Sequence, residues 1–411
     1  MKENKTKPDI RFKGFTEAWE QRKVSKITKF HKQGFYTIED YNDNKKYYLL
    51  RGTDFSENKL LLKDTPKINA TKKDYEAFKT ELGDFLIVRS GTVGTYGIVD
   101  VDIPAIFGSY LIDFRFDMEQ VTNEFFGYFY QSDLFKSQLN KIIQTSANTN
   151  INAENIKSTV ISLPNLDEQR KISEYLGNLD HLITLHQREC DQLKELKKSM
   201  LKKMFPRDES SIPEVRFAGF TDAWEQRKLI DLCDYVDYRG KTPNKSDSGI
   251  FLVTAKNVKD GYIDYDVSKE YIPEDKYEEV MRRGKPKIGD VLITTEAPCG
   301  NVAQVNKPNI ALAQRIIKYR GHNQVIDNTY LKYYLLSPFF QNILNMKSSG
   351  GTVQGIKGSV LHQQKISFTK YTEQLKIGQC LDSLDSLITL HQRELEILKN
   401  LKKTCLKRMF I

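Results

Sequence analysis

A sequence repeated at a fixed distance constrains this chain more than any other feature. The eight residues LITLHQRE occur at 182–189 and again, unchanged, at 387–394, which is 205 positions later. The two copies belong to longer segments, 168–205 and 373–410, which align without a gap and are identical at 24 of 38 positions. Chance does not produce identity at this level, so the chain contains two copies of one unit.

The same offset relates the beginnings of the two halves. IRFKGFTEAWEQRK at 10–23 aligns with VRFAGFTDAWEQRK at 215–228, which pairs Trp19 with Trp224. The long middles between these conserved ends differ much more and keep only a faint register. Because 411 residues are enough for two domains that each bury a core, we expect two halves that share one fold.

The late segments of both halves predict long helices. They contain no proline, lysines crowd into their last turns, and Pro206 directly follows the first segment. Apolar residues recur every three or four positions over about four heptads, which is typical of a coiled-coil seam. We expect the two helices to pair along this seam, which includes Leu179, Ile183, His186, Leu193, Leu384, Ile388, His391 and Leu398.

Two histidines on the seam, His186 and His391, raise the question of a metal site. No second histidine or cysteine stands at i+4 in ligand spacing, and a buried polar residue in a coiled coil more often fixes the register between helices. The 5 cysteines are widely spaced and include no CxxC pair, so neither a zinc site nor a disulfide framework is indicated. We expect no metal and no cofactor.

The divergent middles, at about 30–160 and 235–365, mix strand and helix signals. Short apolar runs such as FLIV and VLIT follow Gly-Asp pairs and predict strands, whereas NEFFGYFYQSDLFKSQLNKI predicts a helix. Each middle is therefore expected to be an α+β domain. The loop RSGTVG at 89–94 leads toward another strand, so it does not fit a nucleotide-phosphate loop. It is either a glycine-permitted hairpin that binds nothing or a turn that presents polar side chains to a ligand.

Comparison of the two copies favours ligand contact at this loop. Arg89 aligns with Thr295, and Ser90 with Glu296, when the second copy is shifted by one residue. Arginine can bind guanine O6 and N7 and glutamate can accept from cytosine N4, so such exchanges would change the base that each half reads. A net charge of +9 permits a nucleic-acid partner, although any one of the polar clusters could be a solvated loop. The candidate DNA contacts are Arg51, Thr53, Arg89, Ser90, Thr92, Asn148, Asn150, Arg239, Lys241, Thr242, Lys256, Asn257, Thr295, Glu296 and Thr352.

Catalytic machinery is not visible in the sequence. The chain lacks the Asn/Asp-Pro-Pro-aromatic motif of amino-methyltransferases and the GxxxxGK loop of ATP motors, and the E-x-K triplet at 274–276 fits chance. No catalytic residue is therefore proposed. No apolar run approaches the roughly 18 residues of a membrane-spanning helix, and the N-terminus does not resemble a signal peptide, so we expect a cytoplasmic protein without membrane contact.

Several motifs together resemble the specificity (S) subunits of Type I restriction–modification systems. LPNLDEQRKISEYL at 163–176 is similar to the family's Pro-x-x-x-Glu-Gln-x-x-Ile approach to its shared helix, and both halves open on GFxxAWEQRK. The arrangement of two variable halves framed by repeated helices covers essentially the whole chain. In the second half, FTKYTEQLKIGQCL at 368–381 lacks the proline, so the approach to that helix could differ.

The resemblance implies a non-catalytic DNA reader with an α+β fold and a pseudo-two-fold internal repeat. Two target-recognition domains, at 1–165 and 206–370, would each read one half of a bipartite site in double-stranded DNA. Spacer helices at 166–205 and 371–411 would form an antiparallel coiled coil that separates the readers. It would also dock methyltransferase (M) subunits, two by expectation, and restriction motor-nuclease (R) subunits would join through the M2S1 complex.

Other classes of protein are compatible with the same sequence features. A two-domain scaffold that binds only proteins would also contain repeated domains and helices, and a self-sufficient methyltransferase or nuclease is a third possibility. A two-fold relation between the halves makes one further prediction about the chain's ends. Since the linker at 206–214 joins the first helix to the second repeat, residue 411 should lie close to residue 10.

Overall fold

A computed structural model describes residues 6–37, 44–56, 58–89, 95–142, 151–207, 210–238, 243–350 and 354–411. The chain forms two compact units, unit 1 (Met1–Gln187 with Arg393–Ile411) and unit 2 (Arg188–Gln392). Each unit contains one half of each long helix, because both unit boundaries fall inside those helices. None of the described helices is both long and apolar enough to cross a membrane.

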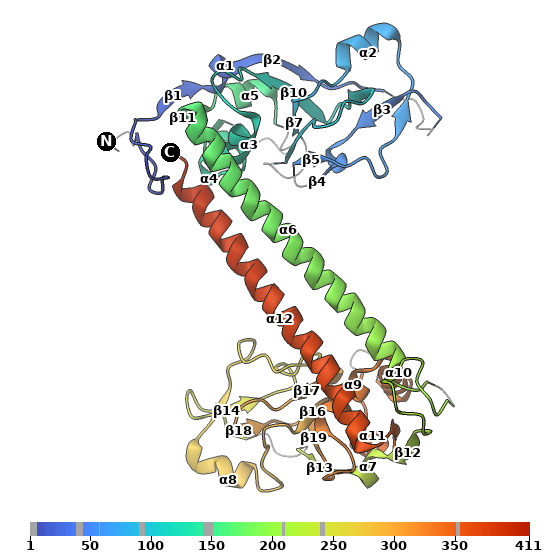
Figure 1. Cartoon of the computed structure of the whole chain (residues 1–411). Coiled ribbons are helices and arrows are strands. Elements are labelled where there is room, and N and C mark those ends of the chain that lie inside the picture. Colours follow the sequence, from blue (N-terminus) through green and yellow to red (C-terminus); the bar gives the residue numbers. More distant parts are fainter. Residues whose placement is uncertain are drawn as a thin grey trace. The chain divides into compact units, whose positions relative to one another are not determined.

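Unit 1 is built on a six-stranded sheet with strand order β2-β10-β7-β8-β5-β4 (Figure 1). A three-stranded sheet, β6-β3-β9, and a two-stranded sheet, β1-β11, accompany it. The strands are β1 (Glu20–Lys23), β2 (Thr28–Gln33), β3 (Tyr47–Leu50), β4 (Phe55–Ser56), β5 (Lys59–Leu60), β6 (Lys67–Ile68), β7 (Phe85–Val88), β8 (Tyr96–Ile98), β9 (Ala105–Phe107), β10 (Leu111–Phe116) and β11 (Val160–Leu163). The helices are α1 (Val24–Ile27), η1 (Gly52–Asp54), α2 (Lys72–Phe78), α3 (Asn123–Gln131), α4 (Asp133–Ile142), α5 (Ala153–Lys157) and the start of α6 (Leu166–Lys203).

Aromatic side chains form the core of unit 1, because α3 packs on the buried strands of the large sheet. The first three residues of the run FLIV of β7 are buried, and Phe85 stacks on Tyr96 of β8 with ring centroids 4.6 Å apart. Phe126 of α3 meets Phe85 edge to face at 5.3 Å. The Thr122 side chain accepts a hydrogen bond from the Phe125 N–H and so caps the start of α3.

Unit 2 repeats this plan with a four-stranded sheet of order β13-β19-β16-β17, together with the sheets β15-β14-β18 and β12-β20. Its strands are β12 (Glu225–Lys228), β13 (Cys233–Asp237), β14 (Ile250–Val253), β15 (Tyr271–Ile272), β16 (Val291–Thr295), β17 (Cys299–Gln304), β18 (Ile310–Leu312), β19 (Ile316–Gly321) and β20 (Lys365–Phe368). Its helices are α7 (Leu229–Leu232), η2 (Glu274–Lys276), α8 (Tyr277–Val280), α9 (Asn328–Leu336), α10 (Pro338–Lys347), α11 (Gly358–His362) and the start of α12 (Tyr371–Arg408).

Strand pairing confirms that the two halves share one fold. Arg22 of β1 lies opposite Ile161 of β11, and Arg227 of β12 lies opposite Ile366 of β20, so both partners move by 205 positions. The parallel pair β3–β9 of unit 1 likewise has a parallel counterpart in unit 2, β14–β18, although β14 is offset from β3 by 203 positions and β18 from β9 by 205. The expected α+β fold with an internal repeat is therefore confirmed, although the middles of the two halves have little sequence in common.

The long helices α6 and α12 pack antiparallel within each unit. In unit 1, Lys402 Nζ of α12 lies 2.6 Å from Asp180 Oδ1 of α6, and in unit 2 the equivalent Lys197 Nζ lies 2.5 Å from Asp385 Oδ1. An early part of one helix thus contacts a late part of the other in both units, as the sequence pattern predicts. All the predicted seam residues are buried or half-buried: Leu179, Ile183, His186, Leu193, Leu384, Ile388, His391 and Leu398.

The seam histidines form ion-pair contacts between the helices. In unit 1, His186 Nδ1 lies 3.3 Å from Glu394 Oε2, and in unit 2, His391 Nδ1 lies 3.3 Å from Glu189 Oε2. The two contacts are related by the repeat. A polar pair at the same place in each copy suits the register-fixing role that the heptad pattern suggests.

The two ends of the repeated unit meet in the same way in both copies. The Ile10 N–H donates to the Arg408 carbonyl at 3.1 Å in unit 1, and the Val215 N–H donates to the Lys203 carbonyl at 3.0 Å in unit 2. Residue 10 therefore lies beside the end of α12, as the repeat predicts.

The missing proline does not alter the approach to the second helix. In unit 1, Gln169 Nε2 donates to the Pro164 carbonyl at 2.9 Å, and in unit 2, Gln374 Nε2 donates to the Thr369 carbonyl at 2.7 Å. Both helices begin two residues after these carbonyls, at Leu166 and Tyr371. Because the hydrogen bond uses only the backbone oxygen, threonine replaces proline without a different path.

Candidate nucleic-acid interface

The end of β7 in unit 1 places Arg89 in a hydrogen-bonded frame. The Arg89 N–H donates to the Tyr110 carbonyl at 2.9 Å, and the Ile151 N–H donates to the Arg89 carbonyl at 3.0 Å. The side chain of Arg89 is half-buried, and that of Tyr110 is 67% exposed. The backbone of Arg89 is therefore fixed on both sides at the tip of the sheet.

Thr295 at the end of β16 occupies the same frame in unit 2. The Thr295 N–H donates to the Arg315 carbonyl at 2.9 Å, and the Ile356 N–H donates to the Thr295 carbonyl at 2.9 Å. This pattern supports the sequence alignment of Arg89 with Thr295 and adds a pair that the alignment did not single out, Tyr110 with Arg315. Thr295 itself is buried, so the exposed side chain of this frame in unit 2 is that of Arg315.

A second tip follows β3 in unit 1 and β14 in unit 2. The buried Asp54 side chain accepts from the Arg51 N–H at 2.6 Å, and the buried Asn257 side chain accepts from the Thr254 N–H at 2.9 Å. A side-chain acceptor three residues ahead closes the same turn in both units. Between these anchors each turn exposes one side chain, which is Thr53 in unit 1 and Lys256 in unit 2.

The position of Asn257 corrects its selection as a DNA contact. Its side chain is fully buried, and its Nδ2 donates to the carbonyls of Asp264 at 2.9 Å and Ser268 at 3.0 Å. The amide is thus satisfied inside the turn and offers nothing to a ligand. The sequence does not separate Asn257 from its exposed neighbour Lys256, because both are polar residues in one loop.

Arg51 is partly committed to the structure of its own turn. Its guanidinium pairs with the buried Asp54 carboxylate, at 2.9 Å from Nη2 to Oδ1, and also donates to the Asp64 carbonyl at 2.9 Å. The Arg51 side chain remains 39% exposed. It can contact a phosphate at its outer edge, but its hydrogen bonds to Asp54 limit bidentate recognition of a base.

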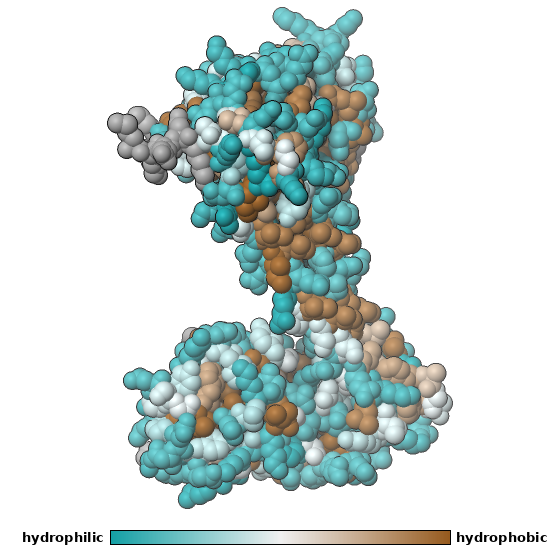
Figure 2. Space-filling model, turned by 60° about the vertical axis from the view of Figure 1, so that its left-hand side comes forward, coloured by the Kyte–Doolittle hydropathy of each residue, from teal (hydrophilic) through white to brown (hydrophobic). Residues whose placement is uncertain are grey.

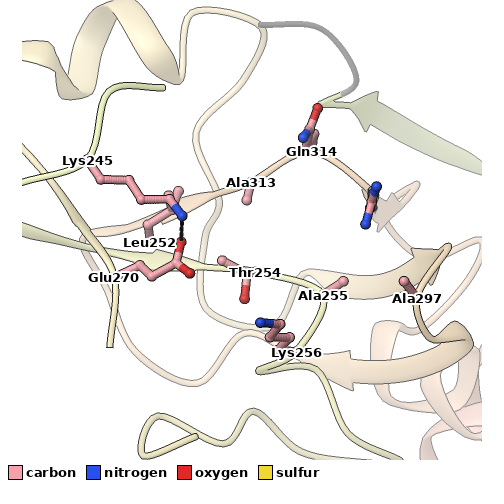
Figure 3. Close-up of a pocket in the computed structure, with 10 residues that line it drawn as sticks. Lys245, Leu252, Thr254, Ala255, Lys256, Glu270, Ala297, Ala313 and Gln314 are labelled. Carbon is pink, nitrogen blue, oxygen red and sulfur yellow. Dashed lines mark ion pairs between the residues drawn. The ribbon is translucent and has the colours of Figure 1, made fainter. Parts of the chain in front are cut away.

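In unit 2 these tips border a cleft of about 300 Å³ (Figure 3). The Lys245–Glu270 ion pair, at 2.7 Å, lies on one side of the cleft, and Gln314 lies on the other. The remaining lining residues are Leu252, Thr254, Ala255, Lys256, Ala297, Ala313 and Arg315.

The charges around the cleft favour an anionic partner. Lys245, Lys256 and Arg315 contribute three cations, of which Lys245 pairs with Glu270 and Arg315 pairs with Glu296. Lys256 is exposed and has no ion-pair partner among the described residues. Cations with hydrogen-bonding side chains between them suit a phosphate backbone with adjacent base edges.

Eight of the residues selected from the sequence lie outside the described ranges. They are Ser90, Thr92, Asn148, Asn150, Arg239, Lys241, Thr242 and Thr352. The sequence comparison overlooked Lys245, Gln314, Arg315 and Tyr110. At the 205-residue offset, Gln314 and Arg315 align with Ser109 and Tyr110. The difference between the side chains of the two copies at this turn is a sequence signal that could have identified Gln314, Arg315 and Tyr110.

Duplicated α+β units whose sheets end in polar tips, combined with paired long helices, define a class of two-domain recognition proteins. The chain matches the family described as "Type I restriction modification DNA specificity domain" over residues 16–195 and again over 221–400. The chain belongs to this family.

Individual relatives agree with this assignment. The chain is 22% identical to the putative Type I restriction enzyme MjaX specificity subunit of Methanocaldococcus jannaschii, over 94% of this chain and 91% of that protein. The match to the MjaVIII specificity subunit of the same organism is 28% identical and spans 61% of this chain and about 60% of that protein.

Solved structures show the same fold. The S subunit of a Type I restriction–modification system from M. genitalium aligns over 98% of this chain and 99% of its own, with a TM-score of 0.62 and 15% identity. A chain from a structural study of complex assembly and conformational transition in the Type I system aligns over 95% of this chain and 97% of its own, with a TM-score of 0.52 and 17% identity.

Proposed function

We propose that this chain is the DNA-reading subunit of a Type I restriction–modification complex and recognises a bipartite target in double-stranded DNA. The domains at 1–165 and 206–370 each read one half of the target, and the chain directs methyltransferase and restriction subunits to it. The observation that carries this proposal is the shared backbone frame with different side chains at its tips. Arg89 and Tyr110 in unit 1 correspond to Thr295 and Arg315 in unit 2.

This combination fits two readers of different sequences. A constant frame sets the distance of the tips from the DNA, while the side chains at the tips set the donors and acceptors offered to the base edges. Two domains that bound the same ligand would not need such exchanges. The positive cleft of unit 2 supplies the sequence-independent attraction to phosphate that this readout requires.

The long helices carry the features of a docking surface for protein partners. Large apolar side chains are exposed on both helices, and Figure 2 shows apolar surface gathered over them. The exposed side chains are Leu182, Leu185, Ile397 and Leu401 in unit 1 and Leu196, Leu387 and Leu390 in unit 2. Contiguous exposed apolar surface marks sites of protein contact. Leu182 and Leu185 recur as Leu387 and Leu390, so we propose one methyltransferase subunit at each copy.

In this proposal the chain supplies recognition, and its partners supply the chemistry. The methyltransferase subunits transfer methyl groups, and the restriction subunits join through the M2S1 complex. A scaffold that binds only proteins would share the apolar helices but would have no use for the cationic cleft at the sheet tips of unit 2.

Methylation mapping tests the proposal directly. A host without its own Type I system receives the methyltransferase subunit with or without this chain, and its genome is sequenced for modified bases. We expect a bipartite methylated motif only when both are present. An absence of any motif that depends on this chain would contradict the proposal.

Fluorescence anisotropy on a duplex that contains the mapped motif separates a DNA reader from a protein scaffold. Affinity of the complex should fall steeply as salt rises, because phosphate contacts release counterions. Affinity that does not depend on DNA sequence or salt would support the scaffold.

A further inference from the structure

We infer that Arg315 is a specificity-determining residue of unit 2 that reads a guanine in the half-site, and that Glu296 positions its guanidinium. This inference rests on the proposed function and goes beyond it by naming a residue, its partner and the base. Arg315 lies at the turn between β18 and β19, and Glu296 directly follows β16.

The ion pair between these residues leaves the reading edge of the arginine available. Arg315 Nε lies 3.1 Å from Glu296 Oε2. The guanidinium has five N–H donors in a planar fork. The carboxylate therefore attracts the fork on its Nε side, and among the described residues the two Nη groups form no hydrogen bond, so they remain for another acceptor pair. Guanine O6 and N7 are the acceptor pair that a terminal guanidinium contacts most often in the major groove.

Solvent exposure argues against a purely structural role for this pair. The side chain of Arg315 is 48% exposed and that of Glu296 is 43% exposed. Exposed ion pairs contribute little to the stability of a fold. The pair is thus poorly placed to stabilise the unit but well placed to meet a ligand at the tip of the sheet.

The backbone of Arg315 is held in a conformation that arginine rarely adopts. Its φ is +73°, in the left-handed region that glycine prefers. The Arg315 carbonyl accepts from the N–H of the buried Thr295 at 2.9 Å, which fixes this conformation. Non-glycine residues persist in such conformations where the surrounding structure imposes them, and they concentrate at functional sites. The side chain consequently projects from a rigid turn.

The neighbours of Arg315 suit a base reader beside a phosphate contact. Lys245, Lys256 and Gln314 line the same cleft, and Lys256, which has no ion-pair partner among the described residues, can neutralise a backbone phosphate. In unit 1 the equivalent position is occupied by Tyr110, which cannot form the bidentate contact to guanine. The inference therefore also predicts that the half-site read by unit 1 lacks this determinant.

The test uses the full chain with its methyltransferase partner on a panel of duplexes in which each base pair of the unit 2 half-site is varied. The variant Arg315→Gly removes the side chain and places glycine where φ is positive, so the turn should fold without strain. We expect it to lose discrimination at a single G·C pair by roughly 5- to 150-fold, which is the value of one bidentate base contact.

Two further variants complete the comparison. Glu296→Gln should keep the preference for the same base pair but with a smaller ratio, because the fork is held less firmly. Arg282→Ala removes an exposed cation of unit 2 that does not line the cleft, and it should leave the motif and the ratios unchanged.

The outcomes separate this inference from the function on which it rests. If the wild-type complex reads a bipartite motif but Arg315→Gly weakens all duplexes equally, Arg315 is a phosphate contact and the inference is wrong. It is also wrong if the variant behaves like wild type. If the wild-type chain directs no methylation at all, the proposed function itself fails.

Discussion

Arg11 and Glu168 form a bidentate ion pair that connects the first repeated segment to the start of α6. Arg11 Nε lies 2.7 Å from Glu168 Oε1, and Nη2 lies 2.7 Å from Oε2. Glu168 is fully buried. The remaining Nη1 donates to the Glu17 carbonyl at 2.7 Å, so the guanidinium also stabilises the loop between residues 11 and 17.

The second copy repeats this relationship between the same elements. Arg216 contacts Glu373 at 2.7 and 2.8 Å, and its Nη1 donates to the Asp222 carbonyl at 2.7 Å. Each glutamate belongs to the Glu-Gln pair of the helix approach, and each arginine stands just before GFxxAW. In each copy, the two repeated motifs therefore form one joint, which connects the opening segment of the domain to the start of its long helix.

Removal of the arginine should destabilise this joint. Arg11→Met leaves the Glu168 carboxylate buried without its cation, and breaking a buried pair in this way costs about 3–5 kcal/mol. Denaturant unfolding should show this loss. Arg170→Met, which removes an exposed arginine from α6, should change stability by less than about 0.5 kcal/mol. Equal effects of the two substitutions would show that the joint does not stabilise unit 1.

A buried carboxyl in unit 1 should make its stability depend on pH. Asp113 of β10 is fully buried, and neither carboxyl oxygen has a hydrogen-bond partner among the described residues. Arg115 Nε lies 3.7 Å away but pairs more closely with Asp84 at 2.8 Å, and Arg115 Nη1 pairs with Glu81 at 2.9 Å. Burial, reinforced by the nearby Asp84 charge, raises the pKa of Asp113 to about 8.

The direction of the pH effect follows from this raised pKa. Folded unit 1 keeps a proton on Asp113 that the unfolded chain releases near pH 4, so stability is lost as pH rises from about 4 to about 8. Asp113→Asn removes the ionisable group. We expect this variant to be more stable than wild type by about 1–3 kcal/mol at pH 8.5 and equally stable near pH 4. The exposed Asp102→Asn serves as control, and parallel stability curves for Asp113→Asn and wild type would contradict the prediction.

The repeat itself offers a reason to expect this difference between the units. Unit 2 has Lys318 at the position of Asp113, where it lies 3.5 Å from the buried Asp290, which also binds Arg320 at 2.7 Å. Asp290 of unit 2 corresponds to Asp84 of unit 1, because each pairs with the equivalent arginine, Arg320 or Arg115. Asp290 therefore has a nearby cation, Lys318, whereas Asp84 has a nearby second carboxyl group, that of Asp113. Burial lowers the pKa of Lys318, so titration of this lysine raises stability as pH rises, which is the opposite of the effect of Asp113.

The parts of the fold that could be predicted are those encoded by periodicity and repetition. The helical pattern of LITLHQRE and its surroundings predicted α6 and α12, and the offset of 205 predicted a shared fold and the closeness of the last helix end to residue 10. These predictions need only local spacing or internal comparison. Both are visible in one sequence.

The parts that could not be predicted depend on partners distant in sequence or on burial. Arg11 and Glu168 belong to the repeated motifs, but nothing local shows that they meet across 157 residues. Asn257 and Lys256 look equally suited to DNA, and only the closed turn separates the buried amide from the exposed cation. Arg315 follows the short buried strand β18, and the sequence does not mark where this strand ends, so it does not distinguish Arg315 or its aligned partner Tyr110 as tip residues.

Substitution on the exposed helix surface should weaken partner binding without unfolding the chain. Leu185 and its repeat equivalent Leu390 are both exposed, so replacement by glutamate should change stability by less than about 0.5 kcal/mol. A charge in an apolar interface should nevertheless oppose docking. Analytical ultracentrifugation with the methyltransferase subunit should show one bound copy for each single variant and none for the double variant. Gln192→Glu on the exposed side of α6 is the control, and two bound copies in the double variant would place docking elsewhere.

The equivalent meeting of chain ends in the two units predicts that the order of the halves is exchangeable. Ile10 is hydrogen-bonded to Arg408 as Val215 is hydrogen-bonded to Lys203. In the second case the linker at 206–214 connects the end of α6 to the segment that begins at Val215. A permutant that joins Phe410 to Ile10 through a copy of this linker, and opens within 206–214, keeps every helix and strand intact. Exposed connections tolerate such changes. We therefore expect the permutant to fold and to direct methylation to the same bipartite motif.

A second permutant tests whether this tolerance depends on the place of opening. A chain opened between Ile293 and Thr294 interrupts the buried strand β16, which pairs with both β17 and β19, so it should fail to fold. Circular dichroism melts check folding of both permutants, and methylation mapping checks their target. A linker permutant that folds but methylates a different motif would show that each reader depends on its original chain end, and the two-fold equivalence of the units would then not extend to recognition.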